Sequence, residues 1–276
     1  MTRRTVHALL GSLTLLAIGA CSSPSGDPAA IANVTPLGHG LRIAQVSNPS
    51  AADHSKYLPP TPASTAYPTV HITGASFLTV DTFDETQDGK SRGSVYVQDV
   101  GSSAPYSGLS IFTPTWIPAD LRVSPGDVLD FSGPYEELAK IGTAIFPAGQ
   151  VLPQLAKPVG TFRYEYSVPT PTVIDASDLD TYAKGRQWLN MLVTAHDVTI
   201  DVFQNDMKGR ITAKSSMDTT VNGWAISNEL IPIAAGDSAT GMGDYPARST
   251  FKSVTGIVTW FYSFHIAPRS KDDLVQ

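Results

Sequence analysis

Short runs of alternating apolar and polar residues fill the chain from residue 69 onward. In the first half these runs span 69–80, 94–99, 109–113, 127–133 and 143–146. Each run is rich in β-branched or aromatic residues and is bounded by Gly, Pro, Asp or Ser. A period of two with turn residues between the runs is the pattern of half-buried β-strands. The first half therefore predicts a small all-β barrel or sandwich.

A second series of similar runs follows a Pro-containing segment at 168–171. Its runs span 188–194, 198–202, 210–213, 224–226, 253–261 and 264–269. Only 176–184 has a helical pattern, with Asp175 or Ser177 as its cap. Both series have a similar order, and Gly133 and Gly256 stand inside corresponding strands, where a glycine marks a bulge or a sharp bend. This self-similarity predicts two copies of one β module.

The region before these strands has a different composition. Residues 21–66 are rich in Ser, Pro, Ala and Asn, which is typical of an extended or flexible tether. One apolar island, 41–46, alternates like a strand. It either adds an edge strand to the first module, docks on that module, or belongs to a loosely held linker. The predicted organisation is a signal peptide at 1–20, a tether at 21–66, and two β modules at 67–166 and 167–276.

The N-terminus has the parts of a secretory signal: two arginines, an apolar stretch at 8–18, and small residues before a cleavage point. The apolar stretch is shorter than the ~20 residues that span a bilayer. Its end, Gly19-Ala20-Cys21, resembles the lipobox of bacterial lipoproteins, in which the cysteine is lipidated and becomes the new N-terminus. Ser22 follows the cysteine rather than Asp, which implies the outer membrane of a bacterium. The alternative is an ordinary secretory signal in which Cys21 is incidental.

Charge and cysteine content narrow the function further. The formal net charge is −6, and removal of the signal with Arg3 and Arg4 leaves 17 basic against 25 acidic residues, a net charge of −8. Nucleic-acid binding usually needs a basic excess, so the balance opposes it. Cys21 is the only cysteine, so its lipidation leaves no thiol for a disulfide, a metal or a nucleophile. No serine elbow or paired histidine spacing is present, and we expect no enzyme activity.

Two segments of the first module resemble a known domain type. Residues 93–99 (GSVYVQD) and 123–133 (VSPGDVLDFSG) are similar to the OB-fold-like domains found beside extracellular bacterial nucleases and in exported lipoproteins. The ending, 254–274, resembles the last strands of the same domain type. The resemblance implies two tandem OB-like β-barrels. In those nucleases a separate domain performs catalysis, so the resemblance implies the binding module without the enzyme.

Aromatic residues are the best candidates for ligand contacts. OB-type barrels bind ligands across one sheet face, with rings stacking on bases or sugars. The candidates in the two modules are Tyr96, Phe112, Trp116, Tyr135, Trp260 and Tyr262. The alternative is that these rings fill the barrel cores, as most aromatics do.

An acidic loop supplies the one candidate metal site. Asp81, Asp84, Glu85 and Asp88 lie close together in a loop that contains a glycine, and clustered carboxylates of this kind can supply calcium ligands. Their spacing is not that of an EF-hand. The alternative is a solvated acidic hairpin loop with Lys90 and Arg92 as local partners.

Together these observations favour a membrane-anchored, non-enzymatic lipoprotein with a binding or scaffolding role at the cell envelope. An envelope protein or polymer is the expected partner, and calcium is the one candidate cofactor. Two alternatives stay open: an accessory module of extracellular nucleic-acid processing that binds single strands, and a calcium-dependent adhesion module.

Overall fold

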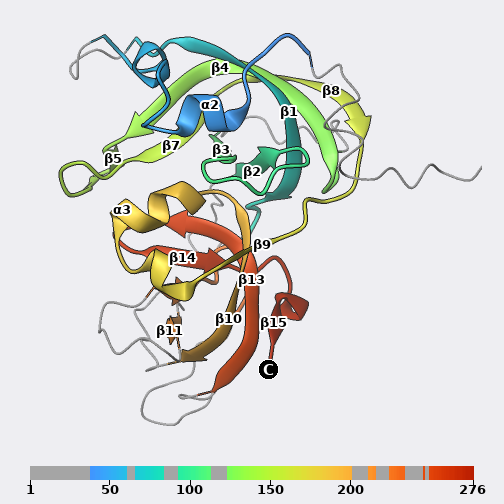
Figure 1. The fold of residues 1–276 in the computed structure, drawn as a ribbon, viewed down its shortest axis with the longest axis vertical. Coiled ribbons are helices and arrows are strands. Elements are labelled where there is room, and N and C mark those ends of the chain that lie inside the picture. Colours follow the sequence, from blue (N-terminus) through green and yellow to red (C-terminus); the bar gives the residue numbers. More distant parts are fainter. Residues whose placement is uncertain are drawn as a thin grey trace, which may run out of the picture. The chain divides into compact units, whose positions relative to one another are not determined.

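Strands dominate the computed structural model of the chain, in agreement with the alternating pattern (Figure 1). It describes residues 38–60, 66–83, 93–112, 123–200, 211–215, 224–233, 245 and 249–276. The first part contains α2 (Ile43–Ser47), η1 (His54–Tyr57), β1 (Thr69–Val80), β2 (Ser94–Asp99), β3 (Gly108–Phe112), β4 (Asp127–Leu138), β5 (Lys140–Ile141), β6 (Ala144–Ile145), β7 (Leu152–Ala156) and β8 (Val159–Glu165). The second contains β9 (Thr172–Ile174), η2 (Ala176–Leu179), α3 (Tyr182–Gly185), η3 (Arg186–Trp188), β10 (Leu192–Ile200), β11 (Ile211–Ser215), β12 (Ala225–Ile226), β13 (Thr250–Trp260), β14 (Phe264–Ala267), η4 (Lys271–Asp273) and β15 (Leu274–Val275).

The first sheet closes into a five-stranded barrel. Its strands follow the order β1-β2-β3-β7-β4-β8, and β1 also pairs with β4, which joins the ends of the ring. Within the ring only β3 and β7 run parallel, and the other pairs are antiparallel. The prediction of a small β-barrel in the first series is thereby confirmed.

The second sheet has the order β15-β13-β14-β12-β11-β10-β9, with an additional pairing of β13 with β10. In this sheet β12 runs parallel to β14, and β9 runs parallel to β10. Contacts between Cα atoms keep 35–276 together as one compact unit. The predicted division into separate modules at residue 166 is therefore not confirmed.

A bulge in β1 bends the first sheet. The register between β1 and β4 shifts between Ile72 and Ala75, where Gly74 has a φ of 70°. The hydroxyl of Thr73 and the amide of Gly74 donate to the carboxylate of Asp130, at 2.8 Å and 3.0 Å. Gly74 supplies the left-handed conformation that a bulge of this kind needs.

Gly133 and Gly256, at which a bulge or bend was predicted, allow close packing of the backbone instead. A Cβ on Gly133 would lie 2.8 Å from the Cα of Pro158, and a Cβ on Gly256 would lie 2.4 Å from the carbonyl oxygen of Ala267. Neither distance leaves room for a side chain. Each glycine therefore lets its strand approach a neighbouring segment of backbone.

The strand expected at 143–146 does not belong to the barrel ring. It forms half of the short β5–β6 hairpin, and the ring strand is β7, which the pattern did not predict. Pro153 lies inside β7, and proline lowers the strand signal because it cannot donate to the ladder. The hairpin has a different role: Phe146, just after it, is 5 % exposed and packs in the hydrophobic core of the second sheet.

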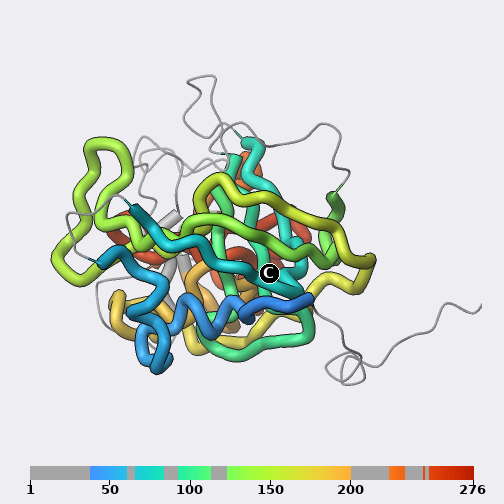
Figure 2. Tube along the Cα trace, turned by 90° about the horizontal axis from the view of Figure 1, so that it is seen from above, coloured from blue at the N-terminus to red at the C-terminus, as the bar shows by residue number. Residues whose placement is uncertain are grey.

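Residues 38–60, expected to belong to the tether, pack on the first barrel. Segment 41–46 contributes only one β-bridge, from Leu41 to Ile72, and then forms helix α2, so the expected edge strand is wrong and the alternative, docking on the first module, is confirmed. Ile43 and Val46 are fully buried in the first core, because their spacing of three places both on one face of the helix. Figure 2 shows this segment, in blue, along the outer side of the first-sheet strands.

The one predicted helical region is confirmed in outline. Residues 176–184 form η2 and most of α3 rather than one continuous helix. Asp175 is the cap, and its carboxylate accepts the amide of Ser177 at 2.8 Å.

Candidate functional site

The two sheets meet in a tightly packed interface. Leu78 and Tyr96 of the first sheet form a small buried cluster with Leu192 and Ile257 of the second. The buried amide of Gln98 accepts from the Leu192 backbone N–H at 3.0 Å through its side-chain oxygen. These contacts fix the strands of one sheet against those of the other.

Backbone segments also meet directly at this interface. A Cβ on Gly108 would lie 2.5 Å from backbone atoms of Asn190 and Met191. Asn190 itself has a φ of 62° and is almost fully buried, and its side chain donates to the carbonyl of Pro153 at 3.4 Å. Gly108 therefore permits an approach between β3 and the segment before β10 that no larger residue would allow.

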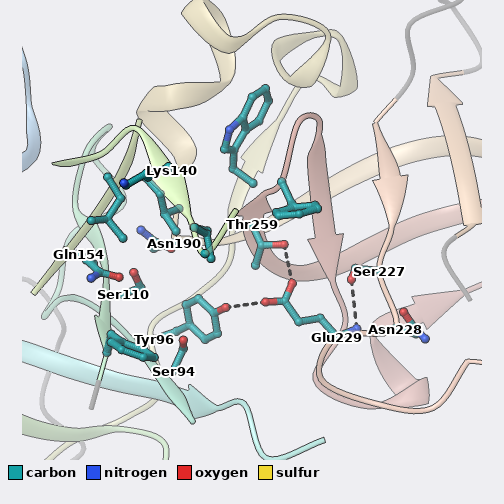
Figure 3. A pocket seen from close by; sticks show the side chains of 17 residues that line it. Ser94, Tyr96, Ser110, Lys140, Gln154, Asn190, Ser227, Asn228, Glu229 and Thr259 are labelled. Carbon is teal, nitrogen blue, oxygen red and sulfur yellow. Dashed lines mark hydrogen bonds between the residues drawn. The ribbon is translucent and has the colours of Figure 1, made fainter. Parts of the chain in front are cut away.

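A cavity of about 480 Å³ lies at one side of the interface (Figure 3). Strands β2, β3 and β7 and the β5–β6 hairpin line it from the first sheet, and the segment after β12 and the end of β13 line it from the second. Its polar lining consists of Ser94, Ser110, Lys140, Gln154, Asn190, Ser227, Asn228, Glu229 and Thr259. Its apolar and aromatic lining consists of Tyr96, Phe112, Leu138, Ile141, Leu152, Trp260 and Phe261, beside Gly142. This volume is typical of ligand pockets.

Glu229 holds the two sides of the cavity together. The Tyr96 hydroxyl from β2 donates to one carboxylate oxygen at 2.9 Å, and the Thr259 hydroxyl from β13 donates to the other at 2.9 Å. Figure 3 shows Glu229 between these two donors, with Lys140, Asn190 and Gln154 on the other side of the view. The Glu229 backbone N–H in turn donates to the Ser227 hydroxyl at 3.1 Å. These two hydroxyl donors to the carboxylate are neutral.

A second carboxylate at the interface, Glu137, has charged partners. It lies near the end of β4 and pairs with Arg186 at 2.5 Å and with His54 at 3.3 Å. The Tyr135 hydroxyl donates to the same oxygen at 3.0 Å. The His54 ring also contacts the carbonyl of Val46 at 2.7 Å. The cluster therefore joins the N-terminal segment, the first barrel and the segment before β10.

These contacts shift the pKa values of His54, Glu137 and Tyr135. The hydrogen bond to Glu137 raises the pKa of His54 above its usual 6.5, although burial acts in the opposite direction. For Glu137 burial favours the neutral acid, but the bond from His54 and the charge of Arg186 outweigh it and lower the pKa below 4.5. Burial raises the pKa of the Tyr135 hydroxyl, and the neighbouring Glu137 raises it further. The cluster thus favours a negative Glu137 between two cations.

The six aromatic candidates lie in different environments. Tyr96, Phe112 and Trp260 all line the cavity, so the structure brings residues from both series together. Tyr135 is fully buried in the first core. Tyr262 is 49 % exposed, and its ring packs against Phe146 at a centroid distance of 5.6 Å. Trp116 lies outside the described residues.

The calcium candidates are mostly outside the described residues. Asp81 is buried directly after β1, whereas Asp84, Glu85 and Asp88 belong to the part that the structure does not describe. Within the described ranges, no group of three or more His, Cys, Asp or Glu side chains could hold a metal ion.

The signal region and Cys21 also lie outside the described residues. In the part of the chain that is described, no helix has the length and apolar character needed to cross a membrane.

Sequence reasoning did not find Glu229, Arg186 or His54. Glu229 follows Ser227-Asn228 without any recognisable motif, and its partner Tyr96 is 133 positions away. In the sequence Glu137 is simply one of two adjacent glutamates. Its partner His54 precedes the strands of the first barrel along the chain, and its partner Arg186 follows them. No local pattern identifies contacts of this kind.

Comparison with known proteins does not place the chain in a family. No protein-family model matches the sequence, and no curated protein matches it significantly.

Proposed function

We propose that the chain is an exported lipoprotein, anchored through Cys21, that binds a ligand without converting it. The cavity at the interface of the two sheets is the observation that carries the proposal. It is lined by aromatic rings and by hydroxyl and amide groups from both sheets, an arrangement suited to holding a small molecule or one unit of a polymer.

The proposal includes two tandem OB-like barrels as the scaffold. Support comes from the strand pairs: β1-β2-β3-β7-β4 in the first sheet and β10-β11-β12-β14-β13 in the second follow the same order, each with one parallel pair. OB-folds bind ligands on the face of strands 2 and 3, beside the loop between the last two strands. The cavity lies against the same parts of the first barrel, namely β2, β3 and the β5–β6 hairpin.

The hydrogen bonds of Glu229, the carboxylate that lines the cavity, are consistent with a binding role. Each oxygen of Glu229 accepts one hydroxyl, and these bonds hold it between β2 and β13. Such a carboxylate is oriented by its neighbours and can accept a further hydrogen bond from a ligand.

Mass spectrometry of the N-terminus tests the anchor. The full chain, expressed in a bacterium that processes lipoproteins, is expected to begin at an acylated Cys21 and to stay in the membrane fraction after a high-salt wash. Cys21→Ser removes the acylated thiol, so no acylated N-terminal peptide is expected from that variant, whereas Ser22→Ala keeps it. A wild-type N-terminus at another residue, or an unmodified Cys21, would contradict the anchor.

A thermal-shift experiment tests binding in the cavity. The probes are maltotetraose, chitotetraose, octathymidylate and trilysine, added to the full chain in a detergent without a sugar head group. A probe at a hundred times its Kd stabilises the folded state by about 2.7 kcal/mol, which shifts the Tm by roughly 5–10 °C. We expect such a shift for at least one probe.

Two variants restrict this result to the cavity. Ser94→Trp fills the cavity from a half-buried position on β2 and should abolish the shift. Ser103→Trp, at an exposed position outside the lining, should preserve it. The proposal fails if no probe shifts the Tm, if the shift survives in Ser94→Trp, or if the probe is chemically altered during incubation.

A further inference from the structure

The polar lining of the cavity is almost entirely uncharged. Seven of its polar side chains carry hydroxyl or amide groups: Ser94, Ser110, Gln154, Asn190, Ser227, Asn228 and Thr259. Such groups can both donate and accept hydrogen bonds. Ligand hydroxyl groups have the same dual capacity, so a polyhydroxylated ligand can match this lining in many orientations.

The two charged residues of the lining disfavour a phosphate ligand. Glu229 lies between Tyr96 and Thr259 and would repel an anion placed beside it. Lys140, the one cationic side chain of the lining, is exposed on β5. A nucleic-acid backbone needs several cations along its path. The same carboxylate is a good acceptor for a ligand hydroxyl.

Aromatic rings complete the arrangement. Phe112 at the end of β3 and Phe261 after β13 are half-buried in the lining, whereas Tyr96 and Trp260 are buried. A pyranose ring has an apolar C–H face that packs on an aromatic ring, and its rim carries hydroxyl groups. Half-buried rings beside neutral polar groups match both features.

From these features we infer that the cavity binds an uncharged saccharide unit. The inference rests on the proposed binding function and names its ligand class. A phosphate-bearing ligand lacks cations here, and a purely apolar ligand would leave the remaining hydrogen-bonding capacity of the hydroxyl and amide groups unused. The unit is either a free oligosaccharide or part of an envelope polysaccharide.

Isothermal titration calorimetry of the full chain, in the same detergent, tests the inference. The titrants are maltotetraose and chitotetraose against octathymidylate and trilysine. At least one saccharide is expected to bind, and Phe112→Ala is expected to weaken its binding about tenfold through the loss of one aromatic contact. The matched control is Phe162→Ala, because Phe162 is 47 % exposed on β8 and does not line the cavity. Its affinity should equal that of the wild type. Retention on amylose or chitin resin would identify the polymer as a source of the unit.

The outcomes distinguish a failure of the saccharide inference from a failure of the proposed binding function. If octathymidylate or trilysine binds in a Phe112-dependent manner and the saccharides do not, the saccharide inference is overturned while the binding function stands. If a saccharide binds with equal affinity to wild type, Phe112→Ala and Phe162→Ala, the cavity is not its site and the inference is overturned. If no titrant binds, both the inference and the proposed function fail.

Discussion

Two glutamates lie at the interface of the sheets, and their surroundings differ in charge. Glu137 has two cationic partners, Arg186 and His54, and its side chain is 12 % exposed. Glu229 has two hydroxyl donors, Tyr96 and Thr259, and lines a cavity. The first carboxylate has its charge neutralised by the protein, whereas the second retains acceptor capacity beside open space.

The difference separates a structural contact from a candidate binding site. The Glu137 cluster joins three segments that are distant in the sequence, and its partners leave little room for a ligand. A buried charge with matched partners is strongly destabilising when one partner is removed. A carboxylate held by neutral hydroxyls contributes less to folding, because its replacement leaves no uncompensated charge behind.

The largest expected effect is a difference in the free energy of unfolding between variants of the two glutamates. Glu137→Gln leaves Arg186 and a protonated His54 without their counter-charge, so we expect the free energy of unfolding to fall by about 3–5 kcal/mol. Glu229→Gln keeps the size and an acceptor oxygen, and we expect a loss of about 1 kcal/mol. Urea denaturation of both variants, with the m-value monitored for two-state behaviour, measures the difference.

Glu136→Gln is the control for the neighbouring position on β4. Its half-buried carboxylate accepts a hydrogen bond from the neutral amide of Gln154 at 2.8 Å. We expect it to behave like Glu229→Gln. Equal losses for Glu137→Gln and Glu229→Gln would show that the two carboxylates do not differ in the way their surroundings suggest.

The sequence predicted two strands of the first sheet with their observed bounds. The run 94–99 coincides with β2, and 69–80 coincides with β1. Prediction failed where a local feature broke the period. The runs 188–194 and 198–202 belong partly to one strand, β10, because Asp197 continues the strand with a φ of 53° instead of turning the chain. Alternation reports which face a side chain occupies and not how far a strand continues.

The candidate site was predictable only in part. Tyr96, Phe112 and Trp260 could be chosen because rings on β-strands are common ligand contacts, and all three line the cavity. The carboxylates could not be assigned roles, because their partners lie on other segments. The helix α2 was missed for a different reason: a five-residue helix with two buried apolar positions is too short to give a helical period.

The smaller expected effect concerns the pH dependence of the charged cluster. Because the pKa of His54 is raised, its contribution to stability is fully present below 6.5 and is lost as the pH rises through its folded-state pKa. Because the pKa of Glu137 is lowered, its contribution is present above 4.5 and is lost as the pH falls through its folded-state pKa. Both contributions are therefore complete between pH 4.5 and 6.5.

His54→Gln removes the titrating ring and retains a donor for Glu137. We expect the wild type to exceed this variant by about 1 kcal/mol in the free energy of unfolding between pH 4.5 and 6.5, because a charged hydrogen bond is stronger than a neutral one. The excess should shrink at higher pH. Burial raises the pKa of Asp99 to about 6, so its titration lowers stability as the pH rises from 3.8. That effect is common to both proteins and cancels in their difference. Urea denaturation at a series of pH values gives this difference, and a constant value across the series would mean that folding does not shift the pKa of His54. The charge of His54 would then not stabilise the cluster, and the contrast with Glu229 would rest on the pair of Glu137 and Arg186.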